Sequence, residues 1–288
     1  RNRCHIPPPP SANAHDRDAT WRDRDVADRD TADRDTADRV AADRDPAPSE
    51  VDASPADSDA ALAERLGDLG RRFAQTAAEI DRTARFPFEN FTALHAQGLV
   101  AAVVPREAGG GGATLSRAGQ IIGAVGRAET STALVLAMTF LVHRALARSD
   151  SRWPIALRDQ VWQSAVEDGG LVNNLRVEPA LGSPSRGGVP ATVARRTHEG
   201  WSLSGHKLYS TGIPGLRWLL VHARTDGALP DVGTFLVPRD LPGIRVIESW
   251  DTLGLRASGS HDVVFDDVRL PVEYAVDLRP PGEWAGGP

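Results

Sequence analysis

The sequence predicts an α+β protein in which an all-α N-terminal helical domain is followed by a small antiparallel β-barrel or sandwich domain. Apolar residues recur at helical spacing through residues 54–169, and short runs of alternating polarity, separated by turn residues, fill residues 170–277. Residues 1–53 form a low-complexity tail that we expect to be disordered. Residues 278–288 are rich in proline and glycine and are typical of a linker.

The tail carries two biased segments. Pro7 to Pro10 is a polyproline run, and Ala27 to Pro46 repeats the pentad Ala-Asp-Arg-Asp-Thr with slight drift. A period of five matches neither a helix nor a strand, and the repeat offers too little apolar surface to offset the entropy of ordering it. We interpret the tail as a solvated, disordered extension rather than as a charged interaction arm.

Five helices are expected in the first domain. The first begins near Ser54, because Ser54-Pro55 offers an N-cap followed by a proline at the first helical position. Its apolar residues are spaced by three and four and line one face. These are Leu62, Leu66, Leu69, Phe73, Ala77 and Ile80. The other helices are expected at Phe88–Gln97, at Thr114–Ala128, from an N-cap at Ser131 or Thr132 to about Ala147, and at Pro154–Glu167.

A glycine run, Gly109 to Gly112, resembles a phosphate-binding loop only superficially. No Lys-Ser/Thr pair follows it, and no G-x-G-x-x-G pattern opens a helix after a strand. We therefore expect a flexible loop here. In the helix that follows, Gly119, Gly123 and Gly126 are expected to allow close helix packing.

The second domain is expected to hold short strands. Their lengths and turn spacing favour a small barrel or sandwich over βαβ units, which disfavours a Rossmann dehydrogenase. The expected strands are Leu171–Val177, Pro190–Arg196, Trp201–Ser210, Trp218–Arg224, Gly233–Val237, Ile244–Ile247 and His261–Val268.

Two stretches of this domain carry candidate binding chemistry. In the first, Pro179 stops an extended run and Gly182 permits a tight turn whose N–H groups, beside Ser183, can hold a pyrophosphate. In the second, the alternating strand from Trp201 ends in an aromatic ring, two hydroxyls and a glycine, in the order Tyr209-Ser210-Thr211-Gly212. A ring beside hydroxyl groups suits a flat heteroaromatic ligand with polar edges.

Together these motifs resemble the acyl-CoA dehydrogenase family of flavoproteins. That family reads Thr-Glu-Pro-x-x-Gly-Ser where this chain has Val177 to Ser183, and Trp-Ile-Thr-Asn-Gly where it has Tyr209-Ser210-Thr211-Gly212. A third family motif, Leu-Gly-x-Arg-x-Ser before a strand ending in Val-Pro, is similar to Leu253–Ser258 followed by Val263–Pro271.

The resemblance implies an oxidoreductase that uses FAD to oxidise an acyl thioester between its α and β carbons, as in fatty acid metabolism. It implies an electron-transfer partner and a homodimer or homotetramer. It also implies that the Thr211 hydroxyl lies near the reactive nitrogen of the flavin. The flavin-binding residues that it implies are Asn174, Val177, Gly182, Ser183, Tyr209, Ser210 and Thr211.

Departures from the family pattern favour a second activity. Val177 replaces a threonine, Tyr209 a tryptophan and Gly212 an asparagine, and an asparagine pair precedes the first motif at 173–174. These changes are similar to the monooxygenase-like branch typified by dibenzothiophene monooxygenase, which takes reduced flavin (FMN) from a donor. That branch often has a histidine near the position of Thr139, whereas this chain has His143, interpreted as a packed helix residue.

In the family, a third, helical domain completes the site and supplies the catalytic glutamate. We expect that domain to be missing here, with residues 278–288 as its linker stub, so that the catalytic base lies beyond Pro288. No catalytic residue is therefore nominated. As given, the chain is expected to be inactive, and a non-catalytic fragment is the third alternative.

Composition excludes several other classes. A net charge of −6 and a pI near 5.8 argue against a nucleic-acid-binding surface. A single cysteine, Cys4, excludes a disulfide framework and a cysteine zinc site, so a cytoplasmic location is the default. No metal-ligand spacing is present, and the longest apolar run, Ala133–Val142, is too short to span a membrane.

Three further polar groupings were considered for catalysis. Ser260-His261-Asp262 are strand neighbours that point to opposite faces, so they cannot form a relay among themselves. The carboxylates of Glu178 and of Asp266–Asp267 are interpreted as structural or solvated.

Overall fold

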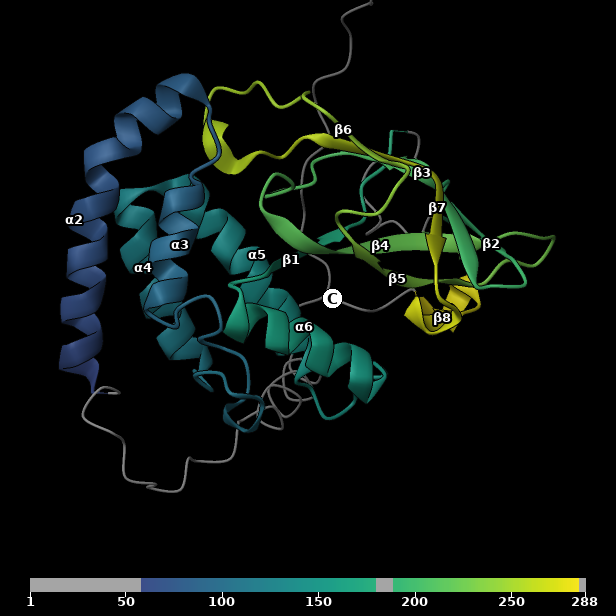
Figure 1. Ribbon diagram of the computed structural model, residues 1–288, viewed down its shortest axis with the longest axis horizontal. Coiled ribbons are helices and arrows are strands. Elements are labelled where there is room, and N and C mark those ends of the chain that lie inside the picture. The colour runs from purple at the N-terminus through teal and green to yellow at the C-terminus, as the bar shows by residue number, and fades with distance from the viewer. Residues whose placement is uncertain (1–57, 180–188, 285–288) are drawn as a thin grey trace, which may run out of the picture. The chain divides into compact units, whose positions relative to one another are not determined.

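The computed structural model describes residues 58–179 and 189–284, in which helices come first and strands follow (Figure 1). The expected tail and two candidate site residues, Gly182 and Ser183, lie outside the described residues. The helices are α2 (Asp59–Thr83), α3 (Phe88–Ala96), α4 (Leu115–Ala128), α5 (Thr130–Leu146) and α6 (Ile155–Glu167).

Helix α2 follows the predicted apolar face but begins later than predicted. Its N-cap is Ser58, not Ser54: the Ser58 hydroxyl accepts a hydrogen bond from the Ala61 N–H at 3.1 Å. The helix ends at Thr83, and its C-cap, Ala84, adopts a left-handed conformation with φ of 55°. Its expected apolar stripe is largely buried, at Leu62, Leu66, Leu69, Phe73 and Ile80.

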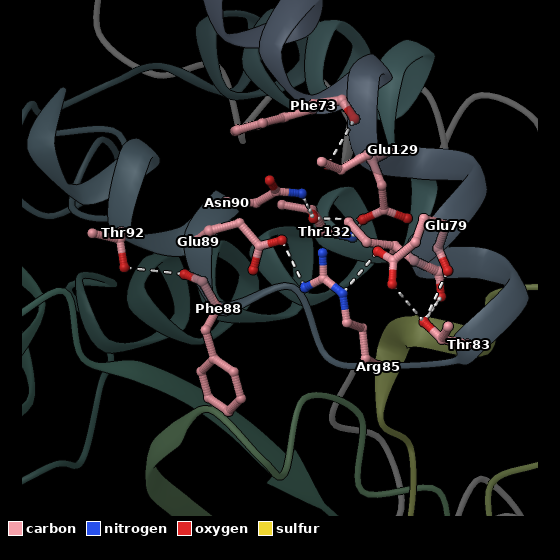
Figure 2. A network of polar contacts seen from close by, with 12 residues as sticks. Phe73, Glu79, Thr83, Arg85, Phe88, Glu89, Asn90, Thr92, Glu129 and Thr132 are labelled. Atoms are coloured by element: carbon pink, nitrogen blue, oxygen red, sulfur yellow. Dashed lines mark hydrogen bonds and ion pairs between the residues drawn. The ribbon is translucent and has the colours of Figure 1, made fainter.

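Helix α5 is capped by a carboxylate, which corrects the prediction of a Ser131 or Thr132 cap. The side chain of Glu129 accepts hydrogen bonds from the N–H groups of Ser131 at 2.9 Å and Thr132 at 2.7 Å (Figure 2). A carboxylate satisfies two free N–H groups at once and its charge complements the helix N-terminus, so it prevails over a hydroxyl. Asn90 on α3 donates to the Thr132 hydroxyl at 3.0 Å, which joins α3 to α5.

The end of α2 is joined to the start of α3 by a charge pair. Arg85 donates to Glu79 at 2.9 Å and lies 2.7 Å from a carboxylate oxygen of Glu89 (Figure 2). All three side chains are partly exposed, so this contact orients the two helices more than it stabilises the fold.

The glycine run after α3 is held firmly by its backbone and is not a flexible loop. Gly110 donates to Pro105 O at 3.0 Å, Gly111 to Ala101 O at 3.1 Å and Gly112 to Val104 O at 2.8 Å. These N–H groups are therefore engaged within the chain, which agrees with the rejection of a phosphate site on this loop. Of the three glycines of α4, only Gly126 lies close to another helix. A Cβ there would lie 3.4 Å from Ala133, whereas one on Gly119 would meet nothing within 4 Å.

Eight strands in the described residues form one mixed sheet. Its order is β6-β7-β3-β2-β4-β5-β8, with β1 paired to β4 off this path. The sheet has two ends along this path and is open, in the manner of a half-barrel. The strands are β1 (Leu171–Leu175), β2 (Val193–Arg196), β3 (Trp201–Lys207), β4 (Leu216–Thr225), β5 (Val232–Pro238), β6 (Ile244–Ile247), β7 (Asp262–Leu270) and β8 (Ala275–Arg279).

The sheet differs from the predicted one in two ways. Strand β4 pairs parallel with both β1 and β2, so the sheet is not purely antiparallel. Strand β8, which pairs with β5, was not predicted because its five residues carry little apolar alternation. Residue periodicity shows which face of a strand is buried, but it does not show which strand lies beside it or in which direction.

Helices and sheet pack together in two buried apolar clusters. Phe73, Leu94 and Leu136 of the helices belong to the same buried cluster as Leu203 and Phe235 of the sheet. No helix in the described part of the chain is long and apolar enough to cross a membrane.

Polar contacts fix the boundary between α5, α6 and the sheet. The Thr139 hydroxyl on α5 donates to Val172 O on β1 at 3.1 Å. The Trp218 indole on β4 donates to the Ser164 hydroxyl on α6 at 2.8 Å. The start of β1 is therefore positioned by α5, which matters because the candidate site begins at the end of this strand.

One buried histidine predicts how stability depends on pH. His143 on α5 is fully buried, and neither ring nitrogen has a hydrogen-bond partner among the described residues. Burial lowers its pKa to about 4, whereas the unfolded chain has the usual value of 6.5. Between these values the unfolded chain binds the proton more tightly, so stability falls as the pH is lowered.

We expect the His143→Leu variant to lose less stability than the wild type between pH 7 and pH 5, by about 2 kcal/mol. Urea unfolding at the two pH values measures this difference. Replacing the exposed His198 by leucine serves as the control and is expected to leave the pH dependence unchanged. Equal pH dependence in wild type and His143→Leu would contradict the prediction.

Candidate functional site

Two segments distant in sequence lie side by side at the end of β1. The Asn173 side-chain amide donates to Thr211 O at 2.9 Å, and the Leu208 N–H donates to Val177 O at 2.9 Å. Residues 173–177 therefore run alongside residues 208–211. This arrangement brings together the described candidate residues, which are Asn174, Val177, Tyr209, Ser210 and Thr211.

Tyr209 presents an aromatic ring to solvent from a strained backbone. It is 59% exposed, and its φ of 53° is in the left-handed region that residues with side chains rarely adopt. Its ring lies edge-on to Trp250, with centroids 6.2 Å apart and planes at 79°. Trp250 is itself fixed, because its backbone N–H donates to the His261 ring and its indole to Leu255 O. An exposed ring held in this way can lie against a flat ligand.

Backbone bonds align the segment from Tyr209 to Gly212 with the start of β7. Ser210 donates to His261 O at 3.0 Å and Gly212 donates to Ser258 O at 2.8 Å. Gly212 has a φ of 83°, which favours glycine at this turn. The Ser210 hydroxyl is buried and has no hydrogen-bond partner among the described residues. A buried hydroxyl without a partner is costly unless a ligand supplies one, so this segment is a candidate for ligand binding.

The Thr211 hydroxyl contacts Ser260, and Ser260 contacts Ser258; neither serine was predicted to be a site residue. Thr211 Oγ1 lies 3.0 Å from Ser260 Oγ, which in turn lies 2.7 Å from Ser258 Oγ. Ser258 ends the third motif, but nothing in a single sequence pairs it with a threonine some fifty residues earlier. The closeness of these hydroxyls is a tertiary feature.

Behind the site lies a buried ion pair. Lys207 Nζ donates to Glu178 Oε1 and to His222 O, both at 2.5 Å, and both charged side chains are almost fully buried. Glu178 also accepts from Ala191 N at 2.6 Å and from the Thr192 hydroxyl at 2.6 Å. Glu178 is thus structural and not solvated. It links the start of the first motif to β3 and to the two residues just before β2.

The pKa values in this cluster follow from burial and charge. Burial would raise the pKa of Glu178, but the Lys207 ammonium and the Thr192 hydrogen bond hold it below its usual value. Burial lowers the pKa of Lys207 to about 8 despite the Glu178 carboxylate. Burial also lowers the pKa of His222 to about 4, with the charges of Arg176 and Lys207 acting in the same direction. His222 is therefore neutral at pH 7.

Lys207 was within reach of sequence reasoning. Counting by two from Trp201 and Leu203 along the predicted strand places Lys207 on the buried face. A lysine on a buried face requires a carboxylate partner, and Glu178 lies in the neighbouring motif.

The other polar residues considered as catalytic candidates, Ser260-His261-Asp262 and Asp267, have separate contacts. Ser260 contacts Thr211, the His261 ring accepts from Trp250, and Asp262 contacts His206 at 3.0 Å, so these neighbours form no relay. Asp267 is exposed, and Ser202 and Arg269 lower its pKa. No group of three or more metal-ligating side chains lies together within the described ranges.

Fold and site together define a class of protein. A helical domain precedes an open mixed sheet, and the candidate site lies where β1 and β3 end. The family models for the acyl-CoA dehydrogenase N-terminal domain and middle domain match residues 56–149 and 177–268 respectively. The chain belongs to the acyl-CoA dehydrogenase family.

The relatives have more than one named activity. The chain is 33% identical over 215 residues to the putative acyl-CoA dehydrogenase YdbM of Bacillus subtilis, covering 75% of this chain and 56% of that protein. It is 31% identical over 221 residues to the L-evernosamine nitrososynthase of a Micromonospora species, covering 73% of this chain and 50% of that protein. The crystal structure of KijD3 in complex with FMN and a dTDP-linked amino-keto sugar is 34% identical, has a TM-score of 0.68 and covers 81% of this chain and 56% of that one.

The chain spans about half the length of the curated relatives that it matches. Structures of the dibenzothiophene monooxygenase TdsC from Paenibacillus share the fold at 21% identity, with a TM-score of 0.65 over 76% of this chain and 53% of that one.

Proposed function

We propose that this chain forms the flavin-binding part of an oxidoreductase that acts on the CH–CH bond of an acyl thioester. The observation that supports this most is the joining of residues 173–177 to residues 208–211, which gathers the described residues that the family motifs select. FAD is the proposed cofactor, with FMN as the alternative because the related KijD3 was crystallised in complex with FMN.

The residues present fit a flavin. An exposed ring, Tyr209, stands next to two buried hydroxyls: that of Ser210, which has no partner among the described residues, and that of Thr211. The exposed Asn174 and half-buried Val177 lie on the adjoining segment. Such a mixture of apolar surface with a few polar groups suits a heteroaromatic ring. Gly182 and Ser183 are proposed to hold its phosphates.

Each residue has a proposed task toward that ring. Tyr209 covers one edge of the ring and limits access of water. Thr211 would hold its hydroxyl toward the reactive nitrogen of the ring, and Asn174 and Val177 would bound the ring from the other segment. A bound flavin supplies a ring that accepts two electrons, with that nitrogen unprotonated when oxidised and carrying a hydrogen when reduced.

Dehydrogenation of a thioester also needs a base for the α-proton. The nearest carboxylate in the motif, Glu178, is bound by Lys207 and Thr192 and is unsuited to this task. We therefore assign no base within this chain.

Flavin-dependent monooxygenation is the second candidate. It is favoured by the likeness to KijD3 and to L-evernosamine nitrososynthase and by the asparagine pair at 173–174. Two assays of the purified protein separate the candidates. Anaerobic bleaching of the flavin by an acyl-CoA panel supports dehydrogenation. Oxygen uptake with reduced flavin and an organic acceptor, without such bleaching, supports monooxygenation.

Flavin binding itself is tested with the Thr211→Val variant, which keeps the side-chain shape and removes the hydroxyl. We expect the wild type to bind FAD or FMN, and the variant to bind about tenfold more weakly, the effect of losing one hydrogen bond. Equilibrium dialysis with each flavin measures both dissociation constants. Thr83→Val, on the exposed end of α2, is the control and is expected to bind as the wild type does. Failure of the wild type to bind either flavin would refute the proposed function.

A further inference from the structure

A cavity in the helical domain lies apart from the candidate flavin site. It has a volume of about 620 Å³ and lies where the start of α2, the end of α3, the glycine run and the start of α4 come together (Figure 1). None of the described candidate flavin-binding residues lines it. A cavity of this size accommodates a small organic ligand. It is therefore a candidate site for a ligand other than the flavin.

Positive side chains dominate the wall of this cavity. Its described lining includes Arg65 on α2, Arg106 just before the glycine run and Arg117 on α4, whereas Asp59 is the one carboxylate. Arg117 donates to Asp59 at 2.5 Å, so these two charges offset each other. Arg65 and Arg106 then give the wall an excess of positive charge, although the whole chain has a formal net charge of −6. Such a wall attracts anions.

Local packing positions two of these arginines. The Arg65 guanidinium donates to Gln97 O at 3.3 Å, which joins it to the end of α3. Arg106 lies across Gly112: a Cβ on that glycine would lie 2.8 Å from Arg106 Cγ, and its φ of 59° also favours glycine. Guanidinium groups that are held in place in this way lose less side-chain entropy when they bind a ligand.

The arginine side chains, and not the backbone of the glycine run, are the groups suited to bind an anion. The N–H groups of Gly110, Gly111 and Gly112 donate to backbone carbonyls within the chain. A guanidinium binds phosphate oxygens through two parallel hydrogen bonds. Because several guanidinium groups line one cavity, a ligand with two linked phosphates matches the wall better than a single carboxylate, which one guanidinium satisfies.

We propose that this cavity binds a diphosphate group, which Arg65, Arg106 and Arg117 contact. Inorganic pyrophosphate and a nucleoside diphosphate share this chemistry. The apolar part of the wall, which includes Leu62 and Ile121, can contact an attached nucleoside. The proposal goes beyond the proposed function and does not depend on it, because the cavity and the candidate flavin site share no described residue.

Isothermal titration calorimetry of the full chain with sodium pyrophosphate, without added metal, tests the proposal. We expect saturable binding that weakens as salt is added. Arg65→Gln and Arg106→Gln each remove one cation and are expected to bind about tenfold more weakly, the effect of losing a hydrogen bond to a charged group. ADP is titrated in parallel. Tighter binding of ADP than of pyrophosphate identifies a nucleoside diphosphate as the ligand, and equal or weaker binding identifies pyrophosphate.

Two further variants make the outcome decisive. Asp59→Asn releases Arg117 from its ion pair, so it is expected to bind pyrophosphate about two- to fivefold more tightly than the wild type, a gain that damage to the fold would not produce. Arg217→Gln removes an exposed cation on β4, outside the cavity, and is the control that is expected to bind as the wild type does. No saturable binding by the wild type, wild-type affinity in both arginine variants, or no gain in Asp59→Asn would overturn the proposal. None of these results bears on flavin binding, which the dialysis experiment tests separately.

Discussion

Replacing Lys207 by methionine is expected to destabilise the protein by about 3–5 kcal/mol. The substitution leaves Glu178, which is 2% exposed, as a buried carboxylate without its cationic partner. It also leaves His222 O without the hydrogen bond that Lys207 donates. A buried charge without a partner costs far more than the net contribution of the ion pair itself. Urea unfolding at pH 7 measures the loss.

Two comparisons show whether the loss comes from the unpaired charge. The double variant Glu178→Gln/Lys207→Met removes both charges and keeps a side-chain amide for Thr192, so it is expected to be more stable than Lys207→Met alone. Arg217→Met breaks an exposed ion pair, 3.3 Å from Asp240, and is expected to cost less than about 1 kcal/mol. If Lys207→Met costs no more than Arg217→Met, the ion pair has no structural role.

Replacing Gly110 by alanine is expected to destabilise the protein by about 3 kcal/mol or more. A Cβ at this position would lie 2.3 Å from Val104 O and 2.4 Å from Val104 Cβ, closer than non-bonded atoms approach. Val104 is fully buried, and Gly110 donates to Pro105 O, so neither side can move without disrupting the loop. Thermal and urea unfolding measure the effect.

Gly119 provides the matched control for this substitution. It is an exposed residue inside α4, and a Cβ there would meet nothing within 4 Å. Alanine has the higher helix propensity, so Gly119→Ala is expected to stabilise the protein by about 1 kcal/mol. A loss of stability in Gly110→Ala together with a gain in Gly119→Ala would confirm that close backbone contact at Gly110 stabilises this loop. Similar effects at both sites would refute it.

The helices were predicted well because helical periodicity is a local property. The apolar face of α2 and the extent of α4, α5 and α6 follow from residues three and four apart. The caps were less predictable, since Glu129 and Ser131 are both suitable and only the geometry of the turn selects the carboxylate. The alternation of polar and apolar residues predicted the short strands, but it did not predict which strands pair.

The candidate site likewise contains residues that the sequence predicted and residues that only the structure revealed. Family motifs selected Asn174, Val177 and Tyr209 to Thr211, and the structure brings these residues together through bonds between the two segments. Their flavin-binding role remains a proposal. Ser260 was not selected, because its partner Thr211 lies 49 residues away in sequence. Lys207 was not selected either, although strand alternation places it on the buried face; its contact with Glu178, 29 residues away, is seen only in the structure. A single sequence does not show such contacts.

By itself, the sequence determined the order of a helical and a strand-rich region, the family resemblance and the residues of the two binding motifs, because each depends on neighbours along the chain. The tertiary structure alone decided the parallel pairing of β4, the buried Lys207–Glu178 ion pair and the hydroxyl chain behind Thr211. These features arise when folding removes polar groups from water. Each buried group must then find a partner wherever the fold places one.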